Sequence, residues 1–139
     1  MKHEVMTTEN LWGDLPEMET ARSPKQILFE QASVLSDSTK NLLEGSVRVV
    51  KNSNLVACKL VITVPSLDNY QHDVLSVVHD PVMVYPARVF DLAMSRESIA
   101  QDEKELLSML ESILQGDTTR RVISALLRQA HDTIESPPF

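Results

Sequence analysis

The chain has 139 residues, enough for one domain with its own apolar core, and its single cysteine, Cys58, excludes an internal disulfide. The formal net charge is −7 and 4% of the residues are aromatic. This composition argues against nucleic-acid binding, which depends on Lys, Arg and stacking side chains. The apolar runs are too short to span a membrane, and the lone cysteine favours a reducing compartment. We therefore expect a cytoplasmic protein.

The first 22 residues predict an acidic arm rather than a helix or a strand. They hold five acidic and two basic residues, and Gly13 and Pro16 interrupt any regular element. Four large apolar residues in this arm follow a one-face spacing: Leu11, Trp12, Leu15 and Met18. Tryptophan is enriched at the centres of protein interfaces. We interpret the segment as a hydrophobic anchor that docks on this protein or its oligomer, with disorder and a foreign partner as the alternatives.

A helix is predicted to begin at Ser23, the start of a single domain that we expect over residues 23–135. Serine suits the N-cap, Pro24 suits the first helical position, and Gln26 completes a capping box. Apolar residues then mark one face: Ile27, Leu28, Ala32 and Leu35. The short polar side chains of residues 36–39 predict the end of this helix.

The middle of the chain predicts four or five antiparallel strands joined by short turns. The expected strands are 43–49, 55–64, 70–78, 82–85 and, less regular, 89–94. Pro86 predicts that 82–85 lies at an edge of the sheet. In the last strand we expect Phe90, Leu92 and Met94 to point inward.

Two amphipathic helices follow, and residues 136–139 predict a C-terminal tail. Ser98 or Asp102 caps the first helix, and Gly116 ends it. Thr118 or Thr119 caps the second. The predicted fold is thus α+β, with the order α-β-β-β-β-(β)-α-α and a meander sheet packed against the helices. A curled sheet with a pocket between the layers is the alternative.

The sequence contains no catalytic motif that we can identify, and we expect no metal and no cofactor. Its three glycines, Gly13, Gly45 and Gly116, are too far apart for a P-loop or a dinucleotide-binding turn. Cys58 lies on the apolar face of the most buried strand, which favours a small hydrophobe over a nucleophile. Three histidines precede an aspartate, yet neighbours in a strand point to opposite faces. The best metal cluster, if one exists, would combine Asp68, His72 and His79.

Two further groups of polar residues are candidate sites. Arg120 and Arg121, in the first turn of the last helix, could dock an acidic partner or could be a solvated face. A possible pocket would need the polar residues in or near the strands to converge: Asp68, Tyr70, His72, Arg88 and Asp91.

Size, acidity and the lack of a catalytic motif are similar to small adaptor, chaperone or immunity proteins. We therefore expect a non-enzymatic protein-interaction module that binds a protein partner or associates with itself, without nucleic acid or membrane as a partner. The alternative is a small ligand-binding domain or enzyme that uses the polar residues around the third strand.

Overall fold

The structure is a computed structural model that describes residues 8–18, 21–52 and 54–135. It confirms the α+β fold and the predicted order of one helix, then strands, then two helices, and it has five strands where four or five were predicted. The elements are α1 (Pro24–Ser38), β1 (Glu44–Lys51), β2 (Val56–Val64), the short 3-10 turn η2 (Pro65–Leu67), β3 (Tyr70–His79), β4 (Ala87–Asp91), β5 (Arg96–Ala100), α2 (Glu103–Leu114) and α3 (Asp117–Glu135). The predicted tail 136–139 lies outside the described residues.

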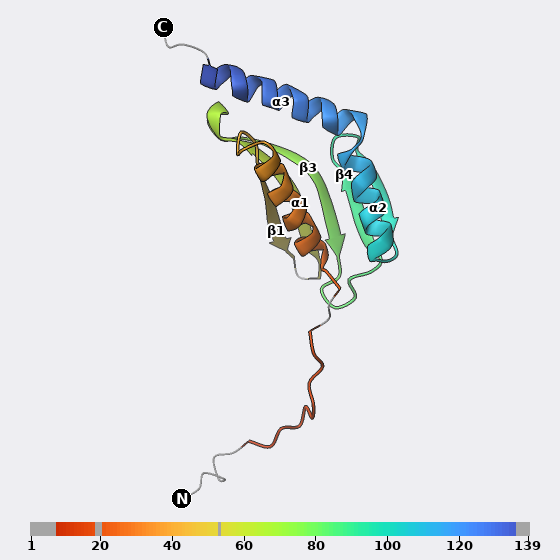
Figure 1. Cartoon of the computed structure of the whole chain (residues 1–139). Coiled ribbons are helices and arrows are strands. Elements are labelled where there is room, and N and C mark those ends of the chain that lie inside the picture. Colours follow the sequence, from red (N-terminus) through yellow and green to blue (C-terminus); the bar gives the residue numbers. More distant parts are fainter. Residues whose placement is uncertain (1–7, 19–20, 53, 136–139) are drawn as a thin grey trace, which may run out of the picture.

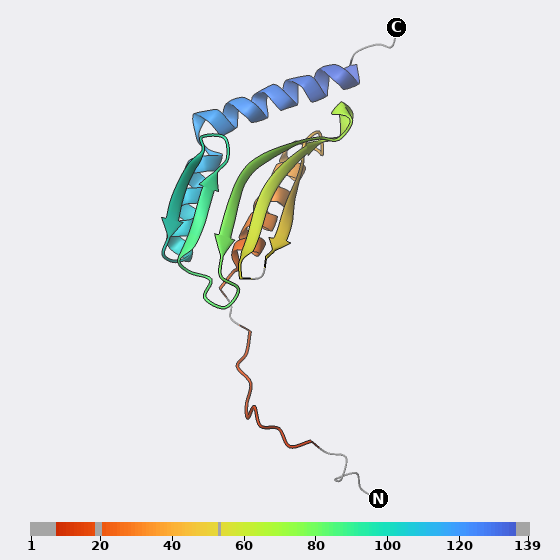
Figure 2. The same ribbon diagram turned by 180° about the vertical axis from the view of Figure 1, so that it is seen from behind.

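The five strands form one antiparallel meander in the order β1-β2-β3-β4-β5. The long strands β1, β2 and β3 pair along most of their length, but β3 pairs with β4 only from Leu75 to Val78. The sheet therefore opens between β3 and β4 toward the start of β3 (Figure 2). Helices α1 and α2 cover the same face of the sheet, while α3 crosses the end where the sheet opens and packs on η2 (Figure 1).

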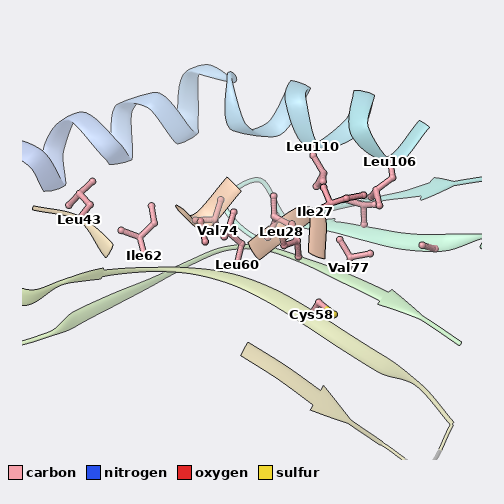
Figure 3. Close-up of a cluster of buried hydrophobic side chains, with 14 of the residues drawn as sticks. Ile27, Leu28, Leu43, Cys58, Leu60, Ile62, Val74, Val77, Leu106 and Leu110 are labelled. Atoms are coloured by element: carbon pink, nitrogen blue, oxygen red, sulfur yellow. The ribbon is translucent and has the colours of Figure 1, made fainter. Parts of the chain in front are cut away.

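The core lies between this face of the sheet and the helices. Alternation along β2 turns Cys58, Leu60 and Ile62 toward the helices, and all three are buried. From α2, Leu106 and Leu110 point toward the sheet beside Ile27 and Leu28 of α1 (Figure 3). Full burial of one such side chain contributes about 1.5–3 kcal/mol. These contacts hold α1 and α2 on the sheet.

Helix α1 approaches the sheet most closely at Gly45 of β1. A Cβ atom built on Gly45 would lie 2.5 Å from the backbone oxygen of Ala32. A polar contact fixes the same junction, because the backbone N–H of Gly45 donates to the Ser36 hydroxyl at 2.9 Å. That hydroxyl donates in turn to the backbone oxygen of Ala32 at 3.2 Å. The absence of a side chain at Gly45 thus sets the distance between α1 and β1.

Two strand predictions were wrong. Residues 82–85 form a loop and not a strand, because the Asp80 carboxylate accepts hydrogen bonds from the backbone N–H groups of Val82 and Met83. The next strand, β4, ends at Asp91, so Leu92 and Met94 lie exposed in the turn that follows. Phe90 points to the outer face of the sheet, as the pairing of Ser76 with Phe90 beside Val77 with Val89 requires.

The sequence did not predict β5, and the position of this strand decides the helix caps. Ser98 is in the middle of β5, so the N-cap of α2 is Asp102, one of the two alternatives. Helix α3 already begins at Asp117, and the backbone N–H of Arg120 donates to the Gly116 oxygen at 3.0 Å. The predicted cap at Thr118 or Thr119 is therefore wrong, and Thr119 is buried inside the fold.

Candidate functional site

A hollow with a volume of about 580 Å³ lies between α1 and α2. We call it the helix groove. From α1 it is lined by Ile27 and Gln31. From α2 it is lined by Lys104, Leu107, Ser108, Leu110, Glu111 and Leu114, and Gln115 closes it. The two helices make few direct contacts with each other, since each packs on its own strands.

The helix groove continues into a smaller cavity of about 210 Å³, which we call the inner cavity. The two spaces share Gln31 and Leu114. The strands β2 and β3 form the floor of the inner cavity. The second half of α1 and the start of α3 form its walls. Its apolar lining includes Ala32, Val34, Leu35, Leu60, Ile62, Val74 and Ile123. An apolar hollow with few polar groups suits an apolar side chain of a ligand or partner.

An arginine bridges the two helices at the end of the helix groove nearest the arm. Arg22 donates to the Glu30 carboxylate of α1 at 2.6 Å and lies 3.5 Å from the Glu103 carboxylate of α2. The hydrogen bond with Glu30 raises the pKa of Arg22, so this guanidinium stays charged. Both walls of the groove are thus tied together at this end.

The two arginines predicted as a docking point lie near the opposite end of the groove. The Arg120 side chain donates to the Gln115 backbone oxygen at 3.1 Å, so it caps the end of α2. Arg121 is exposed beside it and lines neither the helix groove nor the inner cavity. The two arginines thus differ, because Arg120 is held by a hydrogen bond to the end of α2 whereas Arg121 is exposed. Docking of an acidic partner on it stays a prediction.

The described part of the arm runs away from the domain (Figure 1). The four apolar side chains predicted as an anchor are exposed, with Trp12 at 79% and Met18 at 92%. Leu11 and Leu15 are also exposed. The structure therefore does not seat them on their own domain. Docking on another copy or on a partner stays a prediction.

A local turn lies within the described part of this arm. The Asn10 side chain accepts from the backbone N–H of Trp12 at 3.0 Å and donates to the Gly13 oxygen at 3.1 Å. Gly13 has a φ of +68°, a conformation that glycine adopts without steric cost. The turn holds Leu11 and Trp12 together at its tip, which lowers the conformational entropy lost on binding.

The polar residues predicted to form a pocket do not come together. Tyr70 pairs with Val64 at one end of β3, and Arg88 pairs with Val78 near the other end. Eight residues of strand place them roughly 26 Å apart. Arg88 also lies on the outer face of the sheet, where its guanidinium carbon is 5.8 Å from the centre of the Phe90 ring.

The other members of this predicted pocket have local roles. Asp68 occupies the left-handed conformation in the turn between η2 and β3. Asp91 accepts from the backbone N–H groups of Ala93 and Met94 in the turn after β4. Asp91 also lines a separate hollow of about 440 Å³ between β4, β5 and the α2–α3 junction, which contains none of the other four.

The histidine–aspartate pairs do not form a shared site either. His72 pairs with Ile62 on the helix side of the sheet, whereas Asp73 lies 3.3 Å from Lys59 on the opposite side. Within the described residues, no three His, Cys, Asp or Glu side chains are grouped as metal ligands. Cys58 is buried, and burial raises the pKa of its thiol. A protonated buried thiol is a poor nucleophile.

One polar atom of the described core stands out. The Tyr85 hydroxyl is buried and has no hydrogen-bond partner among the described residues. Burial, together with the nearby negative charges of Glu103 and Asp102, raises the pKa of Tyr85. Tyr85 lines neither the helix groove nor the inner cavity, so its hydroxyl is not part of this site.

Comparison with family models, curated proteins and solved structures finds no match. Among the described helices, none combines the length and the apolar character needed to cross a membrane. The role of the arm residues stays a prediction, and the sequence did not predict the helix groove. In the sequence, the apolar residues of α1 and of α2 both look like faces that pack on the core. The groove exists because the two helices lie apart on the sheet, and the sequence does not show this separation.

Proposed function

We propose that this chain is a non-enzymatic protein-interaction module whose arm carries the recognition segment. The observation that carries the proposal is the exposure of Leu11, Trp12, Leu15 and Met18 on a segment that leaves the domain. Clustered exposed apolar side chains on a monomer mark interaction sites. The acidic residues Glu9, Asp14 and Glu17 keep this segment in solution between binding events.

The alternative, an enzyme or a small-ligand site around the third strand, has less support. Its candidate residues lie on different faces and at different ends of β3. The helix groove is lined by four apolar and five polar or charged residues, of which only Lys104 and Glu111 can ionise. Such a lining supports a binding surface better than an acid–base site.

The test compares the native full-length chain with the double variant W12A/L15A. Each protein carries the same tag and is recovered from its own host at native expression, and bound proteins, including untagged copies of the chain, are quantified. We expect the native chain to retain a partner and the double variant to lose most of it. The control T8A/E9Q changes two exposed arm residues outside 11–18, keeps the apolar side chains, and should retain the partner at a comparable order of magnitude. Equal recovery with the native chain and with W12A/L15A would contradict the proposal.

A further inference from the structure

We propose that residues 11–18 of one copy occupy the helix groove of a second copy, and that residues 11–18 of the second copy occupy the helix groove of the first. The inference rests on the proposed function, because it names the partner of the arm. It also assigns a ligand to the helix groove, which the proposed function leaves without one.

The arm segment can be compared with the groove in length and in apolar surface. An extended eight-residue segment spans roughly 26 Å, and the twelve-residue helix α2, which forms one wall, spans about 18 Å. The inner cavity adds further length beyond Leu114. Leu107 and Leu114, both partly exposed, present apolar surface along this path, and Ile27 lies fully buried beneath them. Helix α2 thus matches about five extended residues, 14–18, and the turn at Asn10–Gly13 shortens the start of the segment, which we place at the inner cavity.

The inner cavity is the most suitable seat for Trp12. Its lining is mostly apolar, as an indole ring requires. The side chains of Gln31, Ser38 and Thr119 also line it, and each of them can accept a hydrogen bond from the indole N–H. Val34, half-exposed at the cavity rim, would cover the ring.

Two cations near the groove can pair with the acidic residues of the arm. The arm segment carries Asp14 and Glu17 and no basic residue. The groove has a cation near each end, Lys104 in its lining and Arg120 beside Gln115. Glu111 is the acidic residue of the lining. At the arm end, Arg22, Glu30 and Glu103 add one positive and two negative charges. The groove is therefore close to neutral, and an acidic residue of the arm would bind by local pairing with Lys104 or Arg120.

The geometry of Arg22 favours a second copy over the chain's own groove. Its contacts with Glu30 and Glu103 hold residue 22 across the end of the groove, and the described arm lies outside the domain beyond that end (Figure 1). The described arm residues are exposed and do not occupy the groove of their own copy. Two copies that exchange arms form a closed two-fold dimer.

The buried area is adequate for such a dimer. A tryptophan side chain alone buries about 150–250 Å². Four apolar side chains from each copy, with the matching groove surface, bring the total into the range of about 1,200–2,000 Å² that is typical of stable interfaces. A single arm would bury about half of this area, so the exchange must be reciprocal to give a stable pair.

The first experiment measures self-association with variants on two neighbouring residues of α1. Val34 lines the inner cavity, whereas Ser33 is exposed and lines neither this cavity nor the helix groove. We expect V34E to weaken the dimer at least ~10-fold in sedimentation equilibrium, a loss of about 1.4 kcal/mol, while S33E dimerises like the native chain. The fluorescence of Trp12, the only tryptophan, should shift to the blue as the native dimer forms.

The second experiment locates the arm by cross-linking. Chains that carry E17C are mixed with chains that carry S108C, in the groove lining. We expect a disulfide between the two chains, and none when S33C, the same exchange at an exposed serine outside the groove, replaces S108C. The native Cys58 is buried and stays unreactive in all variants. A chain that carries both E17C and S108C should form the bond at high concentration only between copies.

Several results would overturn the inference. One is a native chain that stays monomeric at every concentration with Trp12 exposed to quenchers. Another is a dimer that V34E does not weaken, or a disulfide that forms within one chain at high dilution. If the arm still retains a different protein in the recovery assay, the proposed function survives while the inference fails. If W12A/L15A changes neither assay, both fail.

Discussion

At the scale of single residues, the position of α1 depends on one glycine. The backbone oxygen and Cα of Ala32 would lie 2.5 Å and 2.7 Å from a Cβ on Gly45. Both are backbone atoms and cannot move aside as the end of a flexible side chain can. Any substitution must push α1 away from β1, and α1 also forms one wall of the helix groove.

We therefore predict that G45A lowers the free energy of unfolding by about 1–3 kcal/mol, the usual cost of overpacking. Urea denaturation followed by circular dichroism measures this loss. The matched control is S46A on the neighbouring, exposed residue of the same strand, which should change stability by less than about 0.5 kcal/mol. Equal midpoints for the two variants would show that α1 does not rest on Gly45.

Cys58 gives a second prediction at this scale. Burial is the main cause of its raised thiol pKa, and the charge of Lys25 opposes that shift only in part. The folded protein thus holds the thiol proton more tightly than the unfolded chain does. Its contribution to stability is complete below the ordinary thiol pKa and is lost as the pH rises through the raised value of the folded state.

The measurement is the free energy of unfolding in urea between about pH 7 and pH 10. We expect the native chain to lose stability over this range, and C58A, despite a lower starting value from its cavity, to lose less of it. Burial also raises the pKa of Tyr85, so ionisation of Tyr85 lowers the stability of both proteins equally at the upper end of this pH range. Parallel pH profiles for the two proteins would rule out the role of the thiol.

At the scale of elements, the start of α2 is fixed by a reciprocal pair of side-chain contacts. The Asp102 carboxylate accepts from the backbone N–H of Glu105 at 2.9 Å. The Glu105 carboxylate accepts from the backbone N–H of Gln101 at 2.7 Å. Both N–H groups would otherwise lack a partner at the helix end.

We predict that D102A costs about 1 kcal/mol in the free energy of unfolding, the usual value for loss of an N-cap. Ser98 was the other candidate cap in the sequence and lies exposed in β5, so S98A should be nearly neutral. Chemical denaturation of the two variants side by side separates the alternatives. A larger loss with S98A would mean that the helix begins earlier than described.

The elements that the sequence predicted well are those with local signals. Ser23 and Pro24 mark the start of α1 by their own chemistry, and the Ser23 hydroxyl does accept the Gln26 N–H, at 3.1 Å. Strand β5 was missed because only Ala100 in it is buried, which leaves no alternating pattern to detect. The helix groove was missed for another reason. Its width follows from how far apart α1 and α2 sit on the sheet, and no local pattern contains that distance.

At the scale of the whole molecule, the arm and the domain have separable tasks. The described arm residues 8–18 are all exposed, so they add nothing to the packing of the core. If two copies exchange arms, however, association stabilises the folded state, and the stability of the native chain then depends on its concentration. A dependence of stability on concentration therefore distinguishes an arm that binds a second copy from an arm that makes no contact with one.

We predict that the native chain shows a Tm that rises with protein concentration, while W12A/L15A shows a Tm that does not. At high dilution, where both are monomers, the two proteins should unfold within about 0.5 kcal/mol of each other, because neither side chain contacts the domain. Differential scanning calorimetry over a wide concentration range measures both effects. At high concentration V34E should show the same loss of the Tm increase as W12A/L15A, because it changes the cavity that binds the arm instead of the arm itself. A concentration-independent Tm for the native chain would argue against the exchanged dimer, and a large loss at high dilution in W12A/L15A would place the arm on its own domain.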